Sequence, residues 1–260
     1  MNDACLNESA PKSAGTLYSR DRLLVQPRGR SRCYDERMAR QRSVFDIVGP
    51  VMIGPSSSHT AGACRLGALA LAIFGSPPIR AHILLHGSFA STGPGHGTDL
   101  ALVAGLLGMH PDDARIPQAF DLADKAGLSV SFAEADLGDA HPNTAVFELQ
   151  DAAGCTIGVR GASLGGGDVV VTQIDLFEVE ITGDLPLLIV GHVDRPGVIA
   201  AVTGLLAQSG VNVASMRVSR ERRGASALML IETDAEVRPS AAEQIAEQPG
   251  VTSVRQVPAV

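Results

Sequence analysis

The sequence predicts an α+β protein with two folded domains after a basic N-terminal extension, and three observations lead to this fold class. A chain of 260 residues is long enough for one or two domains of ordinary size. Helical and strand patterns are mixed from Val44 to Thr182, with a run of strands at the end of that stretch. A second series of elements in the order βαββαβ, the ferredoxin-like layout, begins near Asp184. We therefore expect an extension at 1–42 and domains at 43–182 and 184–260.

The extension differs from the remainder in charge. Nine basic and five acidic residues give 1–42 a net charge of +4, which leaves 12 basic and 23 acidic residues, net −11, for the remainder. Because 1–37 lacks periodicity, we expect it to be disordered, and a start of the native chain at Met38 is the alternative. The extension lacks the uninterrupted apolar stretch that a signal peptide needs, and its acidic residues argue against a transit peptide. The acidic remainder argues against a general nucleic-acid binder.

The composition limits the cellular compartment and the class of protein. The four cysteines are scattered without a C-x-x-C pair, which favours a reducing cytoplasm over a disulfide framework or a zinc site. Apolar runs stay well below the ~20 residues that cross a bilayer, so we expect no membrane span. The mean hydropathy of +0.16 is high for a free surface and suggests that part of it is covered by another chain.

The elements of the first domain follow from periodicity and breakers. A strand at 44–48 leads through a Gly-Pro-Ser loop at 49–58 into a helix at 59–74, where Leu66, Leu69 and Ile73 recur at helical spacing and Gly75 ends the helix. The remaining predictions are a strand at 81–86, a loop at 87–98, a helix at 99–107, a weaker helix at 117–126, and strands at 129–132, 145–149, 156–160 and 169–181.

In the second domain, the residues that begin and end each element are easier to recognise. A strand at 187–193 precedes Asp194, predicted to cap a helix at 198–208, and Gly210 follows that helix. Strands at 211–218 and 226–233 flank a polar turn, which indicates a hairpin. Ser240 with Glu243 forms a capping box for a second helix, and 251–257 supplies the last strand.

The first loop that could carry chemistry runs from Gly54 to Gly62 and feeds a helix. The hydroxyls of Ser56, Ser57, Ser58 and Thr60 beside a helix start could bind a carboxylate or phosphate. His59, with an ordinary pKa near ~6.5, suits proton transfer. The alternative is a Ser-rich cap with a solvent-facing histidine. No P-loop sequence follows, which argues against nucleotide phosphate transfer.

The second loop, at 87–99, holds four glycines around His96, whose backbone could approach a ligand closely, and its alternative is a flexible surface loop. The segments 141–144 and 163–167 read individually as turns. Familiar motifs of hydrolases, zinc proteases and dinucleotide binding are absent from the sequence. A serine hydrolase built from Ser57 and His59 lacks the nucleophile–base–orienter arrangement.

These segments together resemble a known family. The run 44–50 into 54–62, then 87–90 with 95–99, 141–144 and 165–167, resembles the β chain of bacterial iron-sulfur-dependent L-serine dehydratase. The βαββαβ unit with Asp194-Arg195-Pro196-Gly197-Val198 resembles an ACT domain, an amino-acid-sensing module. The resemblance also implies that the first domain shares the fold of the allosteric substrate-binding domain of some phosphoglycerate dehydrogenases.

The resemblance implies a reaction and a division of labour. L-serine would be converted to pyruvate and ammonia with a 4Fe-4S cluster whose cysteine ligands lie on a separate alpha chain, and Cys5, Cys33, Cys64 and Cys155 would not ligate it. His59 would be the general base. Further site residues are expected on the side facing the alpha chain or as weaker substrate or interface contacts: Ser56, Ser57, Ser58, Thr60, His96, Thr98 and Asn143.

The ACT unit leaves two possibilities open. Asp194, Gly197 and Asn212 could bind an amino-acid effector at a dimer interface, or the unit could only pair two sheets. The alternative for the whole chain is a regulatory amino-acid-binding subunit without a part in the chemistry.

Overall fold

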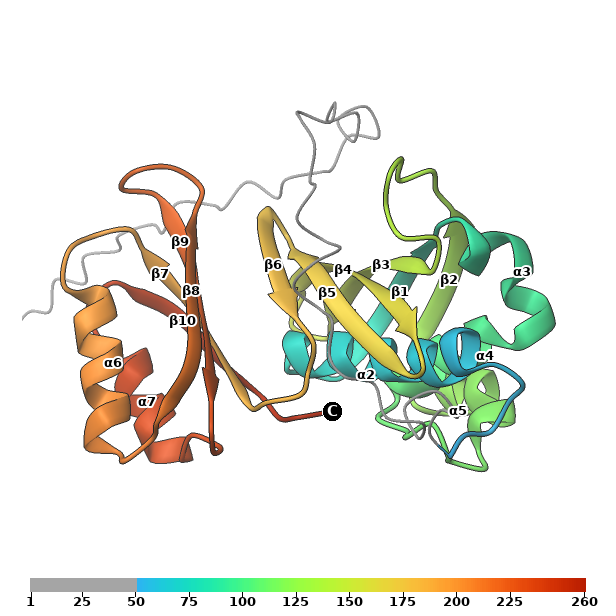
Figure 1. The fold of residues 1–260 in the computed structure, drawn as a ribbon, viewed down its shortest axis with the longest axis horizontal. Coiled ribbons are helices and arrows are strands. Elements are labelled where there is room, and N and C mark those ends of the chain that lie inside the picture. The colour runs from blue at the N-terminus through green and yellow to red at the C-terminus, as the bar shows by residue number, and fades with distance from the viewer. Residues whose placement is uncertain (1–50) are drawn as a thin grey trace, which may run out of the picture. The chain divides into compact units, whose positions relative to one another are not determined.

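The computed structural model describes residues 51–260, which belong to one compact unit, Ser43–Val260. Figure 1 shows two sheets with their helices. The extension, the strand predicted at 44–48, Cys5 and Cys33 lie outside the described residues. In the part of the chain that the structure covers, no helix is long and apolar enough to cross a membrane.

The first domain is built on a six-stranded sheet in the order β2-β1-β3-β4-β5-β6. β1 and β2 are parallel, and every other neighbouring pair is antiparallel. The strands are β1 (Pro78–Leu85), β2 (Ser129–Glu134), β3 (Thr144–Asp151), β4 (Thr156–Gly165), β5 (Asp168–Ile174) and β6 (Phe177–Ile181). A parallel pair needs a long crossover, and the helices between β1 and β2 supply it.

The helices of this domain are a π-helical turn η1 (Ser57–Ala61), α2 (Gly62–Phe74), α3 (Ser88–His96), α4 (Thr98–Leu106), a 3₁₀ turn η2 (Ile116–Gln118) and α5 (Ala119–Lys125). α2 buries Leu66, Leu69 and Ile73 completely, as their spacing predicts, and packs on β4, β5 and α4. Gly75 ends α2 in the left-handed conformation (φ 80°), which confirms the predicted stop.

The crossing of α2 and α4 depends on two glycines. A Cβ on Gly105 would lie 2.1 Å from the Cys64 carbonyl oxygen, and one on Gly67 would lie 2.3 Å from the Leu102 carbonyl oxygen. Both clashes would be with backbone, which cannot rotate away. The two helices therefore approach more closely than any larger residue at these positions allows.

The structure corrects the prediction of a loop at 87–98, because Ser88–His96 is the helix α3. Glycine and proline make this segment a poor helix by propensity, but tertiary contacts override it. Gly87 turns the chain at φ 56°, the Pro142 carbonyl accepts from the Ser88 and Phe89 N–H groups, and Phe89 is fully buried. The strand predicted at 169–181 was also wrong: a turn separates β5 from β6.

The second domain has the predicted βαββαβ order. Its elements are β7 (Leu187–Val193), α6 (Val198–Gln208), β8 (Val213–Arg220), β9 (Ser226–Thr233), α7 (Pro239–Ala246) and β10 (Val251–Val257). The antiparallel sheet has the order β10-β7-β9-β8, and both helices pack on a core that includes Leu188, Val190 and Ile231.

Both predicted caps in this domain were wrong. Gly197 (φ 95°) precedes α6 and Arg238 precedes α7, and neither helix has a side-chain cap. The Asp194 carboxylate accepts instead from the Gly224 N–H and the Arg220 guanidinium, both at 3.0 Å. At α7, Pro239 takes the first helical position, where its missing N–H needs no partner.

Candidate functional site

The candidate site is centred on His59, which lies in the π-helical turn before α2. Ser56 caps this turn, because its Oγ accepts from the His59 backbone N–H at 3.1 Å. The predicted helix start at His59 is corrected by two residues, and the first turn is wider than an α-helical turn. Turns of this kind are frequent at functional sites.

Hydroxyl groups surround both ring nitrogens of His59. Nδ1 lies 3.1 Å from Ser58 Oγ, and Nε2 lies 3.0 Å from Ser88 Oγ and 3.1 Å from Thr92 Oγ1. The ring edge also packs against Phe89, with ring centroids 5.4 Å apart. His59 is half-buried and held on several sides, which does not fit the alternative of a solvent-facing histidine on a cap.

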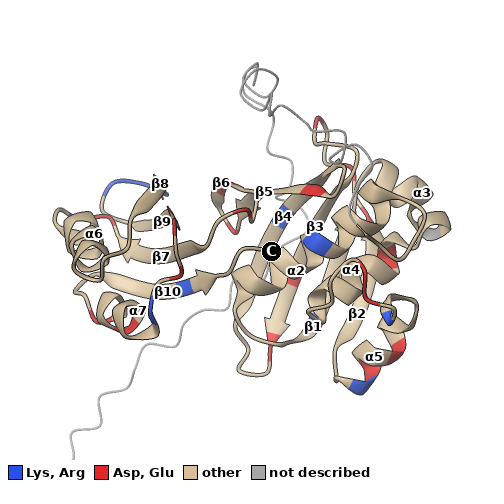
Figure 2. Ribbon diagram, turned by 60° about the horizontal axis from the view of Figure 1, so that its bottom comes forward, with Lys and Arg blue, Asp and Glu red and all other residues tan. Residues whose placement is uncertain are grey.

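The surroundings keep the imidazole neutral. Burial lowers the pKa of His59 from its ordinary 6.5, the positive charge of His96 lowers it further, and a hydrogen bond with the Ser88 backbone raises it in part. The two imidazole centroids are 5.0 Å apart. α3 contains no Lys, Arg, Asp or Glu (Figure 2), so His96 is its one ionisable side chain. Near neutral pH, His59 is an unprotonated base ready to accept a proton.

Several predicted residues meet around this histidine. The Thr60 hydroxyl donates to the His96 carbonyl at 3.2 Å, which joins η1 to α3, and His96 Nδ1 lies 3.0 Å from the Thr92 carbonyl. Ser56 and Ser58 face each other with their Oγ atoms 3.3 Å apart. Ser57, the first residue of η1, is half-buried.

Thr98 lies apart from these groups. Its side chain is completely buried at the start of α4, and its hydroxyl has no hydrogen-bond partner among the described residues. A substrate therefore cannot reach Thr98 without rearrangement of the helix start.

The 141–144 segment lies against the start of α3. The Pro142 carbonyl accepts from the Ser88 N–H at 2.8 Å, and a Cβ on Gly87 would lie 2.7 Å from the same oxygen. The Asn143 amide donates to the Ser163 carbonyl at 3.4 Å. Burial lowers the pKa of His141, whose Nδ1 accepts from the Asn143 N–H. Asn143 thus holds the 141–144 segment to β4. It lies beside the His59 site because its neighbour Pro142 bonds to the start of α3.

Ser88 and Thr92 were missed by the sequence analysis because their segment was predicted as a loop. A signal was present, since Ser88, Thr92 and His96 are spaced four residues apart and share one face of a helix. That face is turned toward His59.

The three residues expected to bind an effector do not meet within one chain. Asp194 follows β7 beside the start of β9, whereas the Asn212 amide donates at 2.7 Å to Asp234, beyond the end of β9. The eight residues of β9 separate these ends by about 23 Å at ~3.3 Å per residue. Gly197 lies on the Asp194 side and lines a hollow of about 430 Å³ with Arg195, Pro196, Val198, Ala201 and Pro249.

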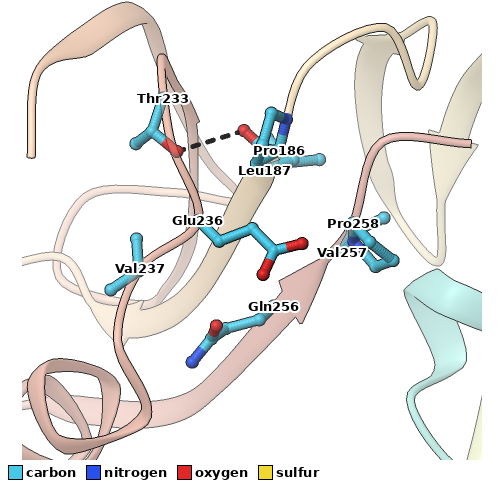
Figure 3. A pocket seen from close by; sticks show the side chains of 8 residues that line it. All are labelled: Pro186, Leu187, Thr233, Glu236, Val237, Gln256, Val257 and Pro258. Carbon is cyan, nitrogen blue, oxygen red and sulfur yellow. Dashed lines mark hydrogen bonds between the residues drawn. The ribbon is translucent and has the colours of Figure 1, made fainter.

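A smaller hollow of about 160 Å³ lies at the other end of the sheet in the second domain. Figure 3 shows Glu236 reaching into it between Leu187 and Gln256. The Thr233 hydroxyl in its wall contacts the Ala235 carbonyl at 2.8 Å and the Pro186 carbonyl at 3.3 Å. No histidine lines this hollow, and it is not the candidate catalytic site.

The described residues do not fit an iron-sulfur cluster. The Cys64 thiol is buried, donates to the Met109 carbonyl at 3.2 Å, and has its pKa raised to about 12 chiefly by burial. Cys155 is exposed, and within residues 51–260 no three His, Cys, Asp or Glu side chains gather in a way that could hold a metal. Thiolate ligation by these cysteines is therefore not supported.

Fold and site together define a two-domain protein: an α+β domain that presents a neutral histidine among hydroxyls, followed by a ferredoxin-like domain. The profile described as serine dehydratase beta chain matches residues 43–126, and that described as ACT domain matches residues 187–250.

Relatives extend the match over most of the chain. A probable L-serine dehydratase beta chain from Bacillus subtilis is 42% identical over 216 residues, which cover 83% of this chain and 98% of the relative. An L-serine dehydratase beta chain from Peptoniphilus asaccharolyticus is 39% identical over 193 residues, or 74% and 87%. A D-3-phosphoglycerate dehydrogenase from Methanocaldococcus jannaschii is 36% identical over 85 residues, 33% of this chain and 16% of that protein. The chain belongs to the serine dehydratase beta-chain family, and the predicted resemblance is confirmed.

Proposed function

We propose that this chain is the beta subunit of a two-chain L-serine dehydratase that converts L-serine to pyruvate and ammonia. The observation that carries the proposal is the neutral, half-buried His59 among hydroxyls in the domain that matches the beta-chain profile. The names of the Bacillus and Peptoniphilus relatives support the substrate class.

In this proposal His59 removes the proton from the substrate α-carbon. The β-hydroxyl takes up one proton and leaves as water, which balances the proton that His59 removed. The product 2-aminoacrylate tautomerises to an imine that water hydrolyses to pyruvate and ammonia. Burial supports His59 in this role, because a lowered pKa keeps the imidazole unprotonated at neutral pH. The protonated ring then faces hydroxyl oxygens that can accept from it.

We assign substrate contacts to the hydroxyls of Ser56, Ser57, Ser58 and Thr60, with His96 and Asn143 at the border of the site. Thr98 stays a weaker candidate because it is buried. The 4Fe-4S cluster belongs in this proposal to a separate alpha chain, since the described cysteines do not fit its ligation.

The second candidate function is a regulatory subunit that binds an amino acid through the ACT unit. The hollow beside Gly197 favours it, because backbone N–H groups at a helix start can bind a carboxylate. An effector site that uses both Asp194 and Asn212 would need two copies, since one chain holds them at opposite ends of β9. We therefore propose an ACT-mediated dimer with this function.

The proposal also includes a division of the chain into an extension at 1–42, a beta-chain domain at 43–182 and an ACT domain at 184–260. It places the enzyme in the cytoplasm. Free thiols at Cys64 and Cys155 are consistent with a reducing compartment.

The test is anaerobic pyruvate formation from L-serine by the full chain alone and after mixing with its candidate alpha chain and reconstituted cluster. We expect activity only in the mixture and a loss of about 10²- to 10⁴-fold in kcat for His59→Ala, because general base catalysis contributes that much. Unchanged kcat in His59→Ala together with an altered response to added amino acids would favour the regulatory subunit.

A further inference from the structure

Two hydroxyls to which the proposed function assigns no substrate contact converge on one nitrogen of its base. Ser88 Oγ and Thr92 Oγ1 lie 3.0 and 3.1 Å from His59 Nε2, and 3.2 Å from each other. Ser88 and Thr92 occupy successive turns of α3, so the helix fixes their spacing. The inference drawn from this cluster rests on the proposed role of His59.

The direction of each hydrogen bond follows from counting protons. Thr92 Oγ1 lies 2.9 Å from the Ser88 carbonyl oxygen, which can only accept. A threonine hydroxyl has one proton, so Thr92 donates to that carbonyl. Toward its other two neighbours, the Ser88 hydroxyl and His59 Nε2, Thr92 is therefore an acceptor.

One tautomer of His59 satisfies every contact. With the proton on Nε2, the ring donates toward the two hydroxyl oxygens, and Ser88 donates to Thr92. With the proton on Nδ1, the lone pairs of Nε2 and Thr92 Oγ1 would face each other at 3.1 Å. The second arrangement leaves a repulsive contact between the half-buried His59 and the exposed Thr92.

We propose that Ser88 and Thr92 are positioning residues that hold His59 with its proton on Nε2, which makes Nδ1 the nitrogen that takes the substrate proton. Ser58 Oγ lies 3.1 Å from Nδ1 and 3.3 Å from Ser56 Oγ, so its hydroxyl has two acceptors to choose from. When Ser58 turns its proton to Ser56, the Nδ1 lone pair is released for the substrate. After proton transfer, Nε2–H still donates to the α3 hydroxyls and stabilises the imidazolium.

The first measurement is the tautomer of His59 by ¹⁵N NMR of the full chain labelled at histidine, with His59→Gln used to assign the signals. The ¹⁵N shift separates a protonated from an unprotonated ring nitrogen. We expect the Nε2–H form in the wild type. Thr92→Val removes the hydroxyl at nearly constant shape and should lower the ratio of Nε2–H to Nδ1–H forms by about fivefold.

Matched variants separate the effect of losing the Thr92 hydroxyl from the effect of altered side-chain packing. Thr92→Ser keeps the hydroxyl and should restore the wild-type tautomer. Ser88→Ala leaves Thr92 as the acceptor and should keep the Nε2–H form. In the reconstituted enzyme, Thr92→Val should lower kcat about tenfold with KM within about twofold, since ground-state binding is not its role. If Val packs poorly, Thr92→Ala gives the same readout, and thermal melting checks the fold.

The outcomes for the tautomer and for the reaction are distinct. An Nδ1–H form in the wild type, or an unchanged tautomer in Thr92→Val, overturns the positioning inference. If the tautomer responds as expected but His59→Gln keeps full activity in the mixture, the tautomer assignment stands and the proposed base is wrong.

Discussion

The first domain and the ACT domain hold their candidate residues in opposite ways. In the first domain, groups distant in sequence converge: Ser58 from the turn before α2, and Ser88 and Thr92 from α3, all contact His59. In the ACT domain, Asp194 and Asn212 are both engaged with neighbours within their own domain and lie at opposite ends of β9. One site is assembled within a chain, and the other is not.

Backbone packing explains part of this difference. α2 and α4 meet through glycines so closely that η1 and α3, which flank these helices, are brought together around His59. α6 has no such restriction, because a Cβ on Gly204 would meet nothing within 4 Å. Close helix packing therefore fixes the first site, whereas the outer face of α6 has room for further contacts.

A pair of glycine substitutions gives the largest expected effect on this comparison. Gly105→Ala places a methyl group 2.1 Å from the Cys64 carbonyl oxygen, so we expect the free energy of unfolding to fall by about 3 kcal/mol. Gly204→Ala, also inside a helix but in open space, should raise it by roughly 0.5–1 kcal/mol through helix propensity. Urea denaturation of the two full-length variants measures both.

The control also reports on assembly. Equal effects at Gly105 and Gly204 would contradict the contrast between the two helix faces. A loss of stability in Gly204→Ala that grows on dilution would indicate that a second copy covers α6, since dimer stability depends on concentration.

The sequence predicted the parts of the fold that are encoded locally. The buried stripe of α2, its end at Gly75 and the order of the ACT elements follow from spacing and breakers. α3 could not be predicted this way, because its stability comes from Phe89 in the core and from the Pro142 carbonyl, both tertiary contacts. The caps at Asp194 and Ser240 failed for a related reason: Asp194 bonds to the β8–β9 turn, and Pro239 begins α7.

The same limit applied to the site. His59 and its serines lie in one segment and were found from a motif, whereas Ser88 and Thr92 were hidden in a segment predicted as a loop. Their four-residue spacing becomes informative only when the segment is known to be helical. The resemblance supplied the reaction, which spacing alone left open.

A second prediction concerns the turn between β8 and β9, which contains Arg222 and Arg223 and is drawn partly in blue in Figure 2. The Gly224 N–H and then Arg220 lower the pKa of Asp194 below its ordinary 3.8. A depressed carboxyl pKa stabilises the fold above pH 3.8, and this contribution is lost as the pH falls through the folded value. Asp194→Ala should therefore make the Gly224 amide exchange with solvent severalfold faster above pH 5.

The ¹⁵N signals of His59 provide the matched comparison for this variant. They should stay unchanged in Asp194→Ala, because the carboxylate bonds to the β8–β9 hairpin of the second domain. A change at His59 would show that the two domains are coupled and would break the contrast between them.

The smallest expected effect lies in the electrostatics of the first site. Burial is the larger cause of the lowered His59 pKa and the charge of His96 is the smaller, so His96→Asn should raise the pKa toward 6.5 without reaching it. Because the base must be unprotonated, the acid limb of kcat/KM should move to higher pH in this variant. For stability, the unfolded chain binds the His59 proton more tightly, so stability rises with pH between the folded value and 6.5, and His96→Asn should narrow that window. An NMR titration of His59 in the full chain checks the direction independently of activity, and a shift to lower pH would mean that His96 stabilises the charged ring instead of repelling it.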